Sequence, residues 1–94
     1  MTLHQLRIWI AVAKRQSMTK AAAELHIKQP SVTQQVKLLE KEYRLKLYEI
    51  NFGRGIELTQ VGRVFLNYAK KILLQVDNLE RELRSSLKRR HRHR

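Results

Sequence analysis

Two short amphipathic segments joined by only three residues constrain the fold of this chain more than any other feature. The first, residues 18–25, contains the run Ala21-Ala22-Ala23, which favours a helix and allows a second helix to approach closely. The joining residues 26–28 are too few for anything but a turn, and Pro30 suits the first turn of a new helix. Across residues 31–43 the apolar positions recur at helical spacing: Val32, Val36 and Leu39.

Patterns on both sides of this pair predict the remaining elements of a small unit. Residues 2–15 carry an apolar stripe at helical spacing, with Thr2 as its N-cap and Ser17 as the cap of the next helix. Between Ile50 and Ile56, two glycines and an asparagine tolerate positive φ, and the flanks alternate as in a two-stranded hairpin. Three helices and such a hairpin, the wing, make a winged helix-turn-helix, whose second paired helix lies in a DNA major groove.

A long helix is predicted to follow Thr59, its candidate N-cap. A helix of about 25 residues extends roughly 37 Å at 1.5 Å per residue, too far for three short helices to cover. Its apolar residues recur at intervals of four and three, the spacing of a coiled-coil seam: Phe65, Ala69, Ile72, Val76, Leu79 and Leu83. We therefore expect a mainly α chain that pairs with a second copy: a winged domain over 1–58, a linker or dimerisation helix over 59–87 and a disordered tail over 88–94.

The charge of the chain indicates an anionic partner. Its 94 residues hold 20 Lys and Arg against 8 Asp and Glu, a formal net charge of +12. Six of these cations follow Glu82 with no further acid, so residues 84–94 carry half of the excess. We interpret the tail over 88–94 either as a native basic arm or as a remnant of an expression vector, and assign no specific function to it.

Other function classes are disfavoured by the residues present. The chain has no cysteine, no signal pattern and no membrane-spanning run, as we expect of a cytoplasmic protein without disulfides. Trp9 shares the apolar face of its helix, so we expect it in the core rather than stacked on a nucleic-acid base. No metal-binding or catalytic pattern joins the histidines or the carboxylates, and we expect no enzyme, no metal and no cofactor: His4, His26, His91, His93, Glu80 and Glu82.

Fragments spread over most of the chain resemble the N-terminal DNA-binding domain and linker helix of the LysR-type transcriptional regulators, a bacterial family. Each fragment is weak alone, but their order and spacing are specific. They are Leu6-Arg7, Val12-Ala13, the runs 17–25 and 29–36, Leu39-Glu40, Leu47-Tyr48-Glu49, Leu58-Thr59 and Gly62.

The chain departs from the family pattern in three respects. Arg44 stands where a turn glycine is usual, so the turn is either reshaped or held in a less common conformation. Ile50 stands where an arginine is usual, which removes a cation from the base of the wing. The family's C-terminal effector-binding domain is missing, so we interpret the chain as a fragment of a longer regulator or a truncated homologue, and expect a small-molecule effector only in a full-length protein.

The start of the helix over 31–43 is the candidate for reading DNA bases. Gln, Ser and Thr side chains donate and accept hydrogen bonds at base edges without the cost of burying a full charge. The resemblance implies contacts to bases and phosphates from the residues at this end: Gln29, Pro30, Ser31, Thr33 and Gln34. The alternative is that Gln29 and Ser31 only cap the helix.

Phosphate contacts are expected from hydroxyls and cations that flank this helix: Thr19, Lys20, Lys28 and Lys37. Arg54 lies at the tip of the predicted wing, and the resemblance implies that it enters the minor groove, where a narrow A·T-rich stretch strengthens the attraction. The alternatives are a solvated turn charge for Arg54 and a solvated surface lysine for Lys37.

Three functions compete. The leading hypothesis is a homodimeric transcriptional regulator that binds an inverted repeat with an A·T-rich core in double-stranded DNA. The alternative is an assembly module that dimerises through the long helix and retains only residual nonspecific nucleic-acid binding. A third reading, nonspecific binding to nucleic acid or to an anionic membrane, depends mainly on the tail.

Overall fold

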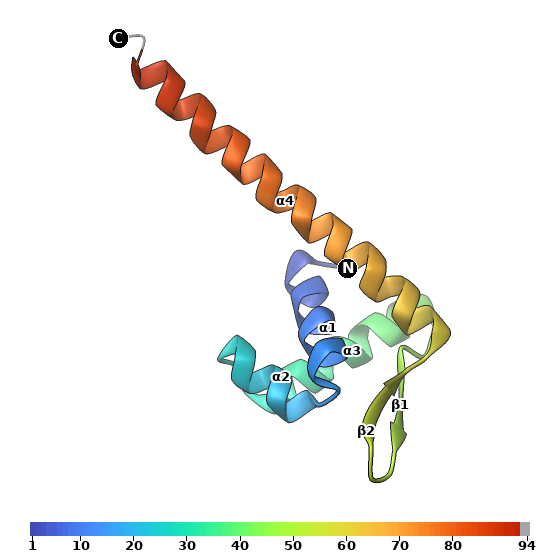
Figure 1. Cartoon of the computed structure of the whole chain (residues 1–94). Coiled ribbons are helices and arrows are strands. Elements are labelled where there is room, and N and C mark those ends of the chain that lie inside the picture. The colour runs from blue at the N-terminus through green and yellow to red at the C-terminus, as the bar shows by residue number, and fades with distance from the viewer. Residues whose placement is uncertain (93–94) are drawn as a thin grey trace.

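The computed structural model describes residues 1–92 of the chain, with side chains described through residue 88, and it has the mainly α winged architecture that the sequence predicts (Figure 1). Three helices form the body, a two-stranded antiparallel wing follows them, and a long helix leaves the domain. The elements are α1 (Leu3–Arg15), α2 (Met18–Leu25), α3 (Gln29–Tyr43), β1 (Tyr48–Asn51), β2 (Gly55–Leu58) and α4 (Gln60–Arg92).

The helix starts are set by local side-chain chemistry. Thr2 accepts a hydrogen bond from the Gln5 amide, and the Gln5 side chain accepts one from the Thr2 amide in return, which makes a full capping box. Ser17 caps α2 by accepting from the Lys20 amide. Thr59 accepts from the Gly62 amide at the start of α4. The three caps predicted from the sequence are therefore confirmed.

The ends of α1, α2 and α3 share an unusual backbone conformation. Gln16, His26 and Arg44 all have positive φ, between 52° and 57°, where glycine is the usual residue. In each case the cap amide still donates to a carbonyl of the last helical turn. The departure at Arg44 therefore leaves the turn after α3 in a left-handed conformation that arginine adopts in place of glycine.

Trp9 is the centre of the core and is fully buried, as predicted. Its ring meets that of Phe65 edge to face, with centroids 6.4 Å apart, and its indole Nε1 donates to the Gly62 carbonyl at 3.1 Å. These two contacts hold the first turns of α4 against α1. The direction in which the long helix leaves the domain is therefore fixed by a core residue.

The domain covers only the first part of the predicted seam on the long helix. Ala69 has no exposed surface and Phe65 is half-buried, so α1 and the chain's own core cover this part. Farther along, Ile72, Leu79 and Leu83 are exposed. The helix continues to Arg92, past residue 88, where the sequence predicts the start of a disordered tail, and residues 93–94 lie outside the described part.

Candidate nucleic-acid interface

Small buried residues in α2 let this helix pack closely against α1 and α3. Ala21 and Ala22 are buried, so α2 packs closely against its neighbours. The turn between the helices is closed by backbone bonds from the His26 amide to the Ala23 carbonyl at 3.3 Å and from the Ile27 amide to the Ala22 carbonyl at 3.1 Å. The start of α3 is thereby attached rigidly to the body of the domain.

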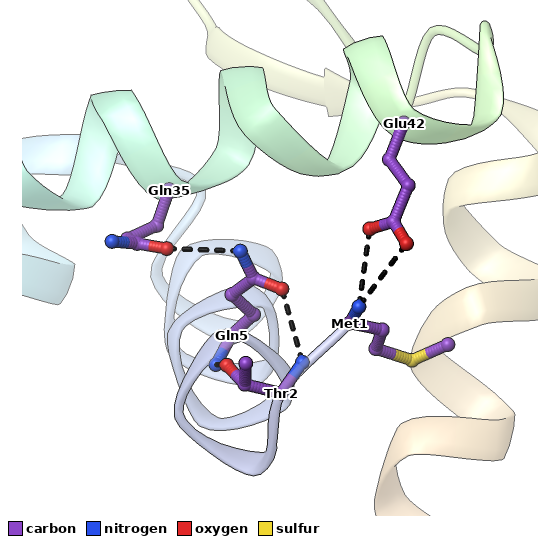
Figure 2. Close-up of polar contacts among 5 residues, drawn as sticks. All are labelled: Met1, Thr2, Gln5, Gln35 and Glu42. Carbon is purple, nitrogen blue, oxygen red and sulfur yellow. Dashed lines mark hydrogen bonds and ion pairs between the residues drawn. The ribbon is translucent and has the colours of Figure 1, made fainter.

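One face of α3 is packed against the core, and this packing determines which of its residues point outward. Val32, Val36 and Leu39 are all fully buried against the core. Gln35 adds a polar contact, because its side-chain oxygen accepts from Gln5 Nε2 at 2.9 Å (Figure 2). The Gln5 side chain thus bonds both to the start of α1 and to the middle of α3. This contact was not foreseen from the sequence, although the Thr2-x-x-Gln5 spacing of a capping box was visible there.

Most of the predicted base-reading residues lie on the exposed start of α3. Gln29, Pro30, Ser31 and Gln34 are all exposed. The N-cap of the helix is Lys28, and no side-chain hydrogen bond caps this end. The alternative in which Gln29 and Ser31 only cap the helix therefore finds no support in the contacts at this end, where both side chains are exposed.

Thr33 differs from the other four. Its hydroxyl oxygen is buried and has no hydrogen-bond partner, although the residue as a whole is half-buried. In this rotamer the hydroxyl is not presented to a ligand, so the structure does not place Thr33 with the exposed candidates. The sequence pattern cannot reveal this, because it fixes the helix face but not the χ1 angle of a side chain at its edge.

Replacing Thr33 by Val is expected to raise the free energy of unfolding by about 1 kcal/mol, because the variant removes a buried hydroxyl that has no partner and keeps the side-chain shape. Urea unfolding followed by circular dichroism measures the change. A lower stability for Thr33→Val would show that the hydroxyl is hydrogen-bonded in solution. Thr33→Ser, which keeps the hydroxyl, is the matched control.

The lysines among the candidate phosphate-binding residues form no ion pairs with acids of the described residues. Thr19, Lys20, Lys28 and Lys37 are exposed, and within residues 1–88 no ion pair joins these three lysines to a carboxylate. The nearby acid, Glu24, is instead paired with other cations: Arg15 at 2.8 Å and Lys14 at 3.5 Å.

The same pairing sets the ionisation of Glu24. The hydrogen bond from the Arg15 guanidinium lowers the pKa of Glu24 below its usual value, against the opposing effect of burial, and the Lys14 charge adds to the lowering. Glu24 therefore stays charged and pairs with cations of α1, and it forms no ion pair with the lysines near the start of α3.

The wing is attached to the domain beside the α1–α2 turn. The Ile56 amide donates to the Gln16 carbonyl at 3.2 Å, and a Cβ on Gly55 would lie 2.9 Å from the same oxygen. The strands pair in the register Tyr48↔Leu58 to Asn51↔Gly55. At the tip, the Arg54 amide donates to the Asn51 carbonyl at 2.9 Å, which closes a tight turn and leaves Arg54 exposed. The predicted hairpin is thus confirmed.

Other kinds of site find no support in the described residues. Among them, no cluster of three or more His, Cys, Asp or Glu side chains is arranged to hold a metal ion. Nor does any helix in the described part combine the length and apolar character needed to cross a bilayer.

Comparison with known proteins gives a consistent result. Residues 3–63 match the family described as "Bacterial regulatory helix-turn-helix protein, lysR family". The chain is 42% identical over 84 residues to the RuBisCO operon transcriptional regulator of Allochromatium vinosum, covering 89% of this chain and 28% of that protein. It is 44% identical over 79 residues to the HTH-type transcriptional activator CmpR of a Synechocystis strain, covering 84% and 26%. The chain therefore spans little more than a quarter of the length of these two relatives.

Solved structures agree with the sequence relatives. The crystal structure of a CbnR_DBD–DNA complex superposes with a TM-score of 0.84 at 38% identity, covering 92% of this chain and 98% of that one. A BenM_DBD complex with catB site 1 DNA gives 0.85 at 38% identity, covering 90% and 94%. With more than half of its residues matched by the family pattern, the chain belongs to the LysR family of bacterial regulatory helix-turn-helix proteins.

Proposed function

We propose that this chain binds double-stranded DNA sequence-specifically as the DNA-binding part of a transcriptional regulator, with the start of α3 in the major groove and the wing at the minor groove. The observation that carries the proposal is the exposed, uncapped end of α3, where polar side chains without partners stand on a helix whose other face is locked in the core. The similar CbnR and BenM domains bound to DNA support it. The relatives are regulators, and we propose no catalytic activity for this chain.

The proposed roles of individual residues follow from their position. Base contacts are assigned to the four exposed residues of the α3 start, and phosphate contacts to the flanking hydroxyl and lysines: Gln29, Pro30, Ser31, Gln34, Thr19, Lys20, Lys28 and Lys37. Arg54, at the tip of the wing, is assigned to the minor groove. For a homodimer through α4, two such surfaces would meet the half-sites of an inverted repeat with an A·T-rich core.

The triple variant Gln29→Ala, Ser31→Ala, Gln34→Ala is expected to lose most base discrimination while still binding random duplex. Each good base contact contributes about 1–3 kcal/mol of discrimination, so the ratio of specific to random affinity should fall at least about tenfold. Selection from a random duplex library at near-physiological salt, followed by titration of the recovered site, measures that ratio.

Two controls accompany this experiment. Asn67→Ala with Asn78→Ala removes exposed amides from α4, away from the proposed interface, and should leave discrimination unchanged. Removal of residues 88–94 tests binding driven by the basic tail, and discrimination should survive it. Full discrimination in the triple variant would remove the base-reading role from α3, and loss of all binding with the tail would favour the nonspecific reading.

A further inference from the structure

The tip of the wing carries an apolar side chain that the domain does not use. Phe52 is 95% exposed and Ile50 is 67% exposed, the two highest values among the large apolar side chains of the described residues. Ile50 pairs across the hairpin with Ile56, but Ile56 is buried in the core whereas Ile50 is exposed. Neither Phe52 nor Ile50 belongs to the core, so packing within the domain does not explain why these two apolar side chains lie at the tip.

The backbone of the wing holds Phe52 in this position. The Arg54 amide bonds to the Asn51 carbonyl, and Gly53 between them has φ of +88°, as the third residue of a type II turn requires. Phe52 is the second residue of that turn and therefore lies at its apex. Apart from its chain neighbours, a Cβ on Gly53 would meet nothing within 4 Å, so the apex of the turn is open.

The charges around the tip favour a nucleic-acid partner over a second copy of the chain. Residues 50–56 contain one cation, Arg54, and no acid. The nearest acids along the chain are Glu49 and Glu57, which lie opposite each other across the hairpin just below the tip, and Glu57 accepts a hydrogen bond from the Asn51 side chain. Figure 1 shows the wing projecting away from the long arm of α4, so pairing along that arm would leave the tip uncovered. The tip remains free to reach the same duplex as the start of α3.

We propose that Phe52 is a wedge at the minor groove, placed beside Arg54 and inserted against a base step that unstacks easily. This inference rests on the proposed function and adds a residue that selects DNA by its deformability. Apolar side chains at minor-groove contacts separate base steps partially and bend the duplex. Pyrimidine–purine steps such as TA unstack most readily, so Phe52 should favour a TA step over a rigid A-tract under the wing.

The test compares single variants on the duplex recovered by the wild-type protein, with either alternating TA or a run of A placed where the wing lies. Phe52→Ala should weaken binding about tenfold on the TA duplex and much less on the A-tract duplex, because a large buried apolar contact is lost. The slope of log affinity against log salt should stay unchanged, since no charge is removed. Arg54→Ala should reduce that slope by about one.

A reporter and a control complete the design. Phe52→Trp should shift its fluorescence to the blue on the TA duplex, against a constant background from Trp9, which is fully buried. Leu74→Ala, an exposed apolar residue of α4, should leave affinity unchanged.

Three outcomes would overturn the wedge. They are wild-type affinity for Phe52→Ala on both duplexes, a loss equal on the two duplexes, or a lower salt slope that shows a displaced Arg54. Failure of the wild-type protein to bind any duplex would instead overturn the proposed function itself, so the two failures are distinguishable.

Discussion

Replacing Gly62 by Ala should lower the free energy of unfolding by about 3 kcal/mol, a large fraction of the roughly 5–15 kcal/mol that stabilises a typical domain. A Cβ at this position would overlap the Leu47 carbonyl oxygen and lie 3.2 Å from the Trp9 ring. Neither neighbour can move freely. Leu47 O accepts from the Thr59 amide at 3.1 Å, and Trp9 Nε1 donates to the Gly62 carbonyl itself. Thermal unfolding followed by circular dichroism, with Trp9 fluorescence as a local probe, measures the loss.

Gly53→Ala is the matched control, because it separates the destabilisation caused by a positive φ angle from the destabilisation caused by a steric clash. Gly53 has φ of +88° but meets nothing within 4 Å. Its replacement should cost only about 1 kcal/mol, the price of a left-handed backbone for a residue with a side chain. Equal stability of Gly62→Ala and the wild-type protein would show that α4 does not pack on Leu47 as described. The direction in which α4 leaves the domain would then differ from the one in Figure 1.

Gly62 also shows where inference from the sequence ends. The sequence marked it as part of a family pattern, but its physical role depends on the backbone of Leu47, which only the folded chain brings next to it. Caps such as Thr2 and Ser17 were predictable because their partners lie three residues away. The burial of Trp9 was predictable because a helical stripe fixes its face.

The candidate site divides in the same way. The exposed start of α3 followed from Pro30 and the periodicity of Val32 and Val36, which are local features. The buried hydroxyl of Thr33 did not, because it depends on a rotamer and on neighbouring helices. The attachment of the wing to Gln16 joins residues 40 apart along the chain, so no local pattern could indicate it.

Placing Asp at Ile72 should convert a dimer to monomers and raise the dissociation constant at least about a hundredfold, because an unpaired charge in a buried seam costs about 3–5 kcal/mol. Ile72 lies just past the part of the seam that the domain covers, where α4 begins to expose its apolar stripe. It also lines a hollow with Leu6 and Tyr68, so a partner helix at this point would contact both the arm and the domain. Sedimentation velocity over a concentration series measures the change.

Leu74→Asp is the control for charge and helix propensity. Leu74 is 55% exposed, against 40% for Ile72, but lies two positions on, about 200° around the helix and away from the seam. It should leave the dimer intact, and unchanged Trp9 fluorescence in both variants would show that the winged domain stays folded. An Ile72→Asp protein that remains dimeric would mean that another surface joins the copies.

The same pair of variants decides between the regulator and the assembly module. If DNA recognition is the function and the dimer serves it, the Ile72→Asp monomer should still prefer a single half-site over random duplex, because the start of α3 is presented by the domain alone. What it should lose is the added affinity for two half-sites in one duplex, which arises only when both domains are linked. A monomer with no preference for any half-site would instead show that base reading depends on assembly, and that α4, rather than α3, carries the specific interaction of this chain.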